Sequence, residues 1–83
     1  MPPKILVVED DASILRGLEL NLQLDGFETV AACDGAAAVE LATRGGIDLV
    51  VLDIMLPVLN GYQVCQKLRA AGNDVPVILL SAK

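Results

Sequence analysis

The sequence predicts an α/β fold whose parallel sheet is built from alternating strands and helices in the order βαβαβαβ. Short aliphatic runs lie at 5–8, 49–52 and 77–80, within predicted strands at 5–8, 47–52 and 75–80, and such runs are typical of parallel strands buried on both faces. The segments between them space their apolar residues as helices do. This alternation favours a parallel sheet with right-handed crossovers.

The first half of the chain contains two predicted strands and two predicted helices. The strand at 5–8 precedes a helix at 12–24, which Asp11 can cap and Gly26 can end. The apolar positions of this helix are Ile14, Leu15, Leu18 and Leu22. A short strand is expected at 28–32, and a helix rich in alanine should run from 35 to about 44.

The second half repeats this pattern. The strand at 47–52 stops at Asp53, and a loop over 54–59 contains Pro57. A third helix begins at Asn60 and Gly61, a turn follows at 72–74, and the last strand is expected at 75–80. No linker or repeat divides the sequence, so residues 1–83 are predicted to form one domain.

Composition excludes several classes of function. The chain has 83 residues and a formal net charge of −5, which disfavours contact with nucleic acid through this segment. It lacks a long apolar run without charges, so no membrane span is expected. Cys33 and Cys65 stand far apart in sequence and are expected to be reduced. These features predict a cytoplasmic protein.

Acidic residues follow two of the predicted buried strands. Glu9, Asp10 and Asp11 come after the first strand, Asp53 after the third, and Ser81 after the last. The carboxyl ends of neighbouring parallel strands meet at one edge of the sheet, where such folds place their functional groups. We therefore expect at least two carboxylates and a hydroxyl to converge there.

Clustered carboxylates repel one another and need a proton or a cation among them. The sequence has no histidine, and oxygen ligands of this kind best suit Mg²⁺. An aspartate beside Mg²⁺ can attack a phosphoryl donor.

Some of these acids also have structural interpretations. Asp11 fits a helix cap better than a metal ligand, and Glu9 could be a solvated acid. Asp53, placed between apolar residues, is harder to assign a structural role.

Three linked segments resemble the receiver domain of two-component response regulators. They are ILVVEDD at 5–11, DLVVLDIMLPVLNG at 48–61 and VPVILLSA at 75–82. The resemblance covers the chain in order, and it is closest to receivers that precede a winged-helix DNA-binding domain in transcription regulators. It implies a flavodoxin-like parallel sheet with strand order 2-1-3-4-5.

The resemblance also implies roles for individual residues. Asp53 would be the phosphoacceptor, phosphorylated by a sensor histidine kinase, and Ser81 the switch hydroxyl. Glu9 and Asp10 would form the acidic pair that holds Mg²⁺ together with Asp53 and the backbone carbonyl of Met55. Asn60 stands where the family more often has aspartate, at a position that is not catalytic.

The resemblance ends before the complete receiver pattern does. It implies an incomplete domain at residues 1–83, without the fourth helix, fifth strand and fifth helix, and without the lysine that contacts the phosphoryl group; Lys83 stands on the wrong segment. We therefore expect impaired phosphorylation of Asp53. We also expect a homo-oligomer that forms through the edge of the strand at 75–80 or the surface of the helix at 12–24.

Two alternatives stay open beside this function. The chain could be a short receiver-like module that binds a protein partner without phosphotransfer. An aspartyl-phosphate hydrolase is disfavoured, because such enzymes need a second aspartate two residues after the nucleophile, where this sequence has Met55. No enzymatic activity is therefore expected.

Overall fold

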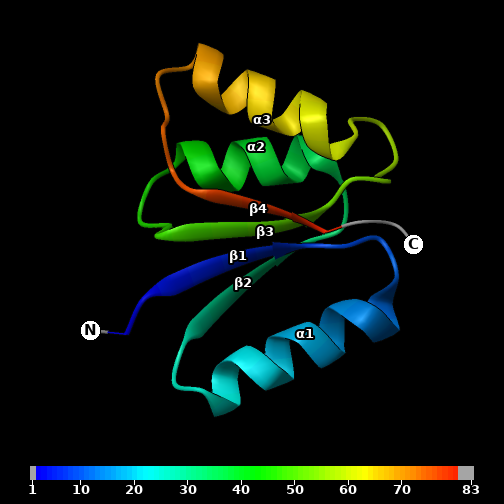
Figure 1. The fold of residues 1–83 in the computed structure, drawn as a ribbon, viewed down its shortest axis with the longest axis vertical. Coiled ribbons are helices and arrows are strands. Elements are labelled where there is room, and N and C mark those ends of the chain that lie inside the picture. The colour runs from blue at the N-terminus through cyan, green and yellow to red at the C-terminus, as the bar shows by residue number, and fades with distance from the viewer. Residues whose placement is uncertain (1, 81–83) are drawn as a thin grey trace.

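The computed structural model describes residues 2–80 and contains a four-stranded parallel sheet with helices on both faces (Figure 1). In chain order the elements are β1 (Lys4–Val8), α1 (Ala12–Leu24), β2 (Glu28–Ala32), α2 (Gly35–Thr43), β3 (Leu49–Asp53), α3 (Gly61–Ala70) and β4 (Val77–Leu80). The strand order is β2-β1-β3-β4, and every pair of neighbours is parallel. The expected α/β class and strand order are confirmed.

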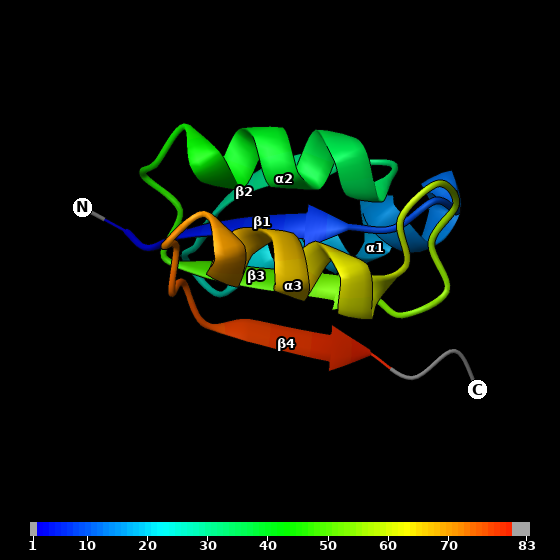
Figure 2. The ribbon, with the colours of Figure 1, turned by 90° about the horizontal axis from the view of Figure 1, so that it is seen from above.

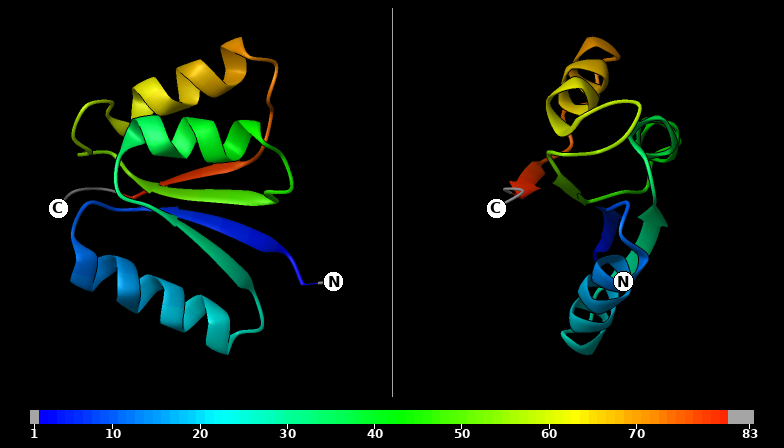
Figure 3. Two further views of the ribbon diagram at one scale, coloured as in Figure 1. Left: turned by 180° about the vertical axis from the view of Figure 1, so that it is seen from behind. Right: turned by 90° about the vertical axis from the view of Figure 1, so that its right-hand side faces the viewer.

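The helices are divided between the two faces of the sheet. Helix α1 lies on one face, whereas α2 and α3 lie side by side on the other (Figures 1 and 3). The connection from β1 to β2 runs in one direction along the sheet, and the connections from β2 to β3 and from β3 to β4 run in the other. Because each crossover is right-handed, this reversal places α1 on one face and the later helices on the other. The reversal leaves β1 and β3 as neighbours whose following segments diverge, which is where ligands bind in such sheets.

Strand β1 shows why these strands are apolar without interruption. Leu6 and Val8 are buried against α2 and α3, whereas Ile5 and Val7 are buried on the opposite face against Leu15 of α1. Successive side chains of a strand point to opposite faces, so a central strand covered on both sides needs apolar residues at every position. The larger cluster, on the side of α2 and α3, includes Val50, Leu52, Val64 and Leu68.

Several element boundaries and one burial assignment differ from the sequence-based expectations: β1, for example, begins at Lys4. Strand β3 begins at Leu49 and includes Asp53, and α2 ends at Thr43. Strand β4 begins at Val77, because Pro76 has no amide hydrogen to donate to a ladder. Ile14 is 51% exposed instead of facing the sheet, since Leu15, Leu18 and Leu22 occupy the inner stripe of α1.

Asn73 and Arg69 fix the turn that leads into β4. The Asn73 side-chain nitrogen Nδ2 donates to the Ala42 carbonyl at 3.0 Å, and its side-chain oxygen accepts from the Val75 backbone amide at 3.0 Å. The Arg69 guanidinium donates to the Val75 carbonyl at 2.8 Å. These bonds join the ends of α2 and α3 to the start of the edge strand.

Within the described residues, no helix has the length and apolar character needed to cross a bilayer.

Candidate functional site

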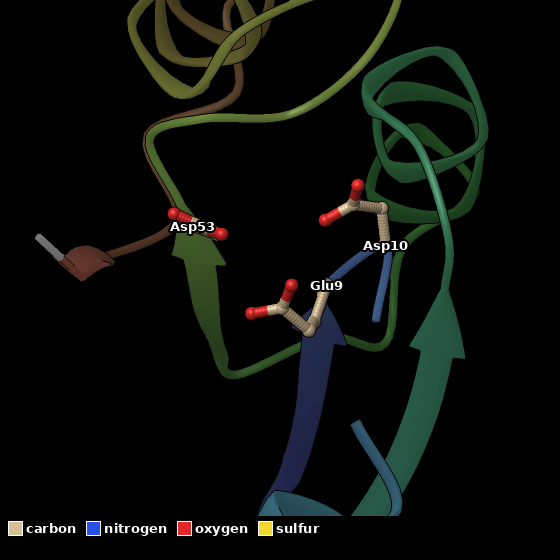
Figure 4. Close-up of side chains that lie close together, drawn as sticks. All are labelled: Glu9, Asp10 and Asp53. Atoms are coloured by element: carbon tan, nitrogen blue, oxygen red, sulfur yellow. The ribbon is translucent and has the colours of Figure 1, made fainter. Parts of the chain in front are cut away.

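Three carboxylates converge at the carboxyl edge of the sheet, as the sequence predicts. Glu9 and Asp10 directly follow β1, and Asp53 ends the neighbouring β3, where Val8 is in register with Leu52. Their side chains are turned toward a shared space (Figure 4). One oxygen from each carboxylate lies within 4.8 Å of the other two.

The three acids differ in their exposure to solvent. Glu9 is only 5% exposed, Asp53 is half-buried and Asp10 is exposed. The Glu9 amide donates to the Ala32 carbonyl at 3.1 Å, so the ladder between β1 and β2 continues one residue past β1 and holds Glu9 in place. The interpretation of Glu9 as a solvated surface acid is therefore wrong.

Burial and negative neighbours make the ionised form of Glu9 costly. Desolvation raises the pKa of Glu9 above its ordinary value of 4.5, and Asp10 and Asp53 raise it further. The hydrogen bond that Glu9 Oε2 accepts from the Asp11 amide at 3.2 Å acts in the opposite direction, since it stabilises the carboxylate. A cation among these oxygens would remove much of the cost.

Asp53 is oriented by the loop that follows it. Its Oδ1 accepts a hydrogen bond from the Met55 amide at 3.1 Å, and the Ile54 amide donates to the Leu80 carbonyl at 3.2 Å. Further along the loop, the exposed Val58 has a positive φ of 70°, a strained conformation for a β-branched residue. The Asp53 carboxylate is thus held by backbone contacts and remains partly open to solvent.

The other polar residues of the predicted site have structural contacts. Asp11 caps α1 through bonds from the Ser13 amide at 2.9 Å and the Ile14 amide at 3.2 Å. Asn60 caps α3, with reciprocal bonds between its backbone and side chain and those of Gln63. Ser81 lies outside the described residues, so its predicted place beside Asp53 stays a prediction.

A close contact at Gly61 is not evident from the sequence, which predicts only the start of a helix there. The Gly61 amide donates to the Ile54 carbonyl at 2.9 Å. A Cβ atom at this position would lie 2.9 Å from the Ile54 Cα atom and 3.1 Å from the Asp53 carbonyl oxygen. A glycine in the first turn of a helix, where a better helix former could stand, is the only signal in the sequence.

The donor set fits a hard divalent cation. Glu9, Asp10 and Asp53 offer only carboxylate oxygens, from two exposed or half-exposed groups and one buried group. Mg²⁺ is usually bound by one or two carboxylates while it keeps several waters, and the exposure of Asp10 leaves room for such waters. This arrangement can hold a cation next to a partly accessible carboxylate.

The raised pKa of Glu9 predicts a specific dependence of stability on pH. Glu9 binds a proton more readily in the folded state than in the unfolded state. Protonation of Glu9 therefore stabilises the fold below pH 4.5, and this stabilisation is lost as the pH rises through the higher pKa of Glu9 in the folded state. In buffer without divalent cations, the free energy of unfolding of the wild type should therefore fall relative to that of Glu9→Gln as pH rises toward neutrality. Urea titrations over a pH series measure this difference, and a difference that does not change with pH would contradict the assignment.

Comparisons with known proteins agree with this geometry. Residues 5–83 match the family model described as the response regulator receiver domain. The chain is 52% identical over 81 residues to the transcriptional regulatory protein PrrA of Mycobacterium tuberculosis, covering 98% of this chain and 35% of that relative. It therefore spans about a third of the length of the curated relatives that it matches.

Solved receiver structures have the same fold. The receiver domain of the Francisella response regulator 1452 superposes with a TM-score of 0.92 at 36% identity, over 96% of this chain and 66% of that one. The response regulator TrrA of Thermotoga maritima, in complex with Mg²⁺ and BeF, gives a TM-score of 0.91 at 37% identity, over 98% of this chain and 70% of that one. The four parallel strands, their order and the sequence match together show that the chain belongs to the response regulator receiver family, with its flavodoxin-like fold.

Proposed function

We propose that the chain is a phosphoacceptor module of two-component signalling in which Asp53 receives a phosphoryl group from a sensor histidine kinase. The observation that carries this proposal is the convergence of Asp53 with Glu9 and Asp10 within 4.8 Å. A half-buried carboxylate next to two other acids, one of them buried, has no evident structural use. We further propose that the chain serves in a transcription regulator rather than as an enzyme, a proposal supported by its 52% identity to a protein named as a transcriptional regulatory protein, PrrA.

The reaction that we propose requires only one nucleophile from this chain. An Asp53 carboxylate oxygen attacks the phosphorus atom of a phosphohistidine, and a new P–O bond forms as the P–N bond breaks. The electron pair of the broken bond goes to the leaving imidazole nitrogen, and Asp53 becomes an acyl phosphate. The Met55 amide, which donates to Oδ1, orients the carboxylate so that its partly exposed side can meet the donor.

Glu9 and Asp10 are the residues that we propose to hold Mg²⁺ together with Asp53, and the Met55 carbonyl is the proposed fourth protein ligand. When bound, Mg²⁺ would neutralise charge on the transferring oxygens. TrrA is a relative whose structure was solved with Mg²⁺ and BeF, which supports the assignment of this metal. Among residues 2–80, no lysine or arginine is ion-paired with these carboxylates. We therefore propose that the 83-residue chain accepts the phosphoryl group slowly.

Acetyl phosphate with Mg²⁺ should add one phosphoryl group to the wild-type chain, slowly, and add none to Asp53→Asn. Asp11→Asn is the matched control, because Asp11 lies next to the site but caps α1, and this variant should be labelled like the wild type. Intact-protein mass spectrometry over a time course measures the label. Equal labelling of Asp53→Asn would contradict the assignment of the nucleophile. A wild type that is never labelled would favour the alternative function, a receiver-like module that binds a partner without phosphotransfer.

We also propose that the chain associates with a second copy of itself through β4 or through α1. In the described part of the chain, β4 is an edge strand of the sheet, and Val77–Leu80 carries no charge to discourage pairing (Figure 2). Ile78 of this strand is 49% exposed. On α1, Ile14, Leu20 and Leu24 are exposed as well. Edge pairing around a two-fold axis would join two such sheets.

Light scattering should detect a dimer or larger species at concentrations on the order of tens of micromolar, where exposed strand edges associate. Ile78→Lys places a charge on the edge strand and should restore a monomer if β4 forms the contact. Ile14→Lys is the matched variant on α1 and should do the same only if α1 forms it. A wild-type chain that is monodisperse and monomeric would contradict self-association.

A further inference from the structure

Helix α3 begins in direct contact with the backbone that carries Asp53. Gly61 is buried, and its amide donates to the Ile54 carbonyl at 2.9 Å. The Ile54 amide in turn donates to the Leu80 carbonyl at 3.2 Å. The residue that follows Asp53 is therefore held between α3 on one side and β4 on the other.

Space at this contact is sufficient only for a hydrogen atom on Gly61. A Cβ atom would lie 2.9 Å from the Ile54 Cα atom and 3.1 Å from the Asp53 carbonyl oxygen, and both of these are backbone atoms. Its third neighbour is the Leu79 Cδ2 atom at 3.0 Å, the end of a side chain that can move. The backbone of Asp53 and Ile54 can make room only by shifting as a whole.

The start of α3 is held by its own cap and by the core. Asn60 and Gln63 form a capping box, with the Asn60 side chain accepting from the Gln63 amide at 2.9 Å and the Gln63 side chain accepting from the Asn60 amide at 2.9 Å. Val64 and Leu68 anchor the same helix in the larger core cluster. The helix cannot move away from a larger residue at 61 without losing capping bonds and core contacts, so part of the displacement falls on the backbone of Asp53 and Ile54.

We infer that Gly61 is a positioning residue for Asp53: its missing side chain lets the backbone at Asp53 and Ile54 lie where the Asp53 carboxylate joins Glu9 and Asp10. This inference rests on the proposed magnesium site. A shift of the Asp53 backbone alters the bond from the Met55 amide to Oδ1, which orients the carboxylate. It also disturbs the cluster, whose ligand oxygens lie within 4.8 Å of one another.

Calorimetric titration of Mg²⁺ into the 83-residue chain tests this inference. Gly61→Ala should weaken Mg²⁺ binding by about tenfold or more, as loss of support for a metal ligand typically does. Gly17→Ala, where a Cβ atom meets nothing within 4 Å, should bind like the wild type. Leu68→Ala, which removes a buried side chain of α3, should also bind Mg²⁺ normally under conditions in which it is folded. Unchanged affinity in Gly61→Ala, or an equal loss in Leu68→Ala, would overturn the inference.

A second readout separates this inference from the proposed metal site. In ¹H–¹⁵N spectra without metal, the Met55 amide signal should move in Gly61→Ala and stay in place in Gly17→Ala, because only the first variant alters its bond to Asp53. A wild type that does not bind Mg²⁺ would refute the metal site, and the Met55 signal would still decide the role of Gly61. If Gly61→Ala does not fold, the rate of hydrogen exchange at the Gly61 amide of the wild type tests the inference instead. This rate should fall when Mg²⁺ is added, and an unchanged rate would overturn the inference.

Discussion

The repulsion among three carboxylates at one sheet edge is the constraint around which this structure is arranged. Glu9 is buried, and the charges of Asp10 and Asp53 add to its desolvation in opposing ionisation. In folding, such a cluster destabilises the chain. It is maintained here because the strand ladder and the loop backbone fix the acids whatever their charge. The Glu9 amide is bonded to Ala32, and Asp53 ends a strand paired on both sides.

The apolar sheet supplies the rigidity that this arrangement needs. Strand β1 is buried on both faces, whereas β3 is buried on the side of α2 and α3 and partly buried, through Leu49 and Val51, on the side of α1. Side chains of these two strands account for much of both core clusters. Interiors packed in this way deform little, so the backbone at the end of such a strand moves little and holds the acid that follows it in place. The loop between β3 and α3 adds a second restraint, because Gly61 brings the helix into contact with Ile54. Core packing and site geometry are therefore linked through the ends of the strands.

Much of the fold could be predicted from the sequence, because a continuous aliphatic run favours a buried strand and a capped amphipathic segment favours a helix. Asp11 and Asn60 are caps in the structure, as residue type and position indicate. One error lies where tertiary packing decides, because Ile14 fits the helical period but lies beside the buried stripe of α1. The late start of β4 has a local cause, because Pro76 has no amide hydrogen to donate.

The acidic cluster could be predicted from the rule that parallel strands end at one edge, whereas the burial of Glu9 could not. Its environment depends on the register of β1 with β2, which brings the Ala32 carbonyl to its amide. The close approach of Gly61 to Ile54 is likewise set by how α3 packs on the sheet, and a single glycine carries no such information. The role of Ser81 is a prediction from resemblance alone.

The dependence of stability on Mg²⁺ tests most directly whether these three carboxylates form a cation site. Denaturant unfolding should give a higher free energy of unfolding for the wild type in Mg²⁺ than in chelator. The increase should be about 2.7 kcal/mol when the free Mg²⁺ concentration is a hundred times the dissociation constant. Asp10→Asn removes one proposed ligand from the exposed side of the cluster and should show a much smaller gain at the same Mg²⁺ concentration. If Mg²⁺ leaves the wild type unchanged, or stabilises Asp10→Asn equally, the cluster is not the cation site described here.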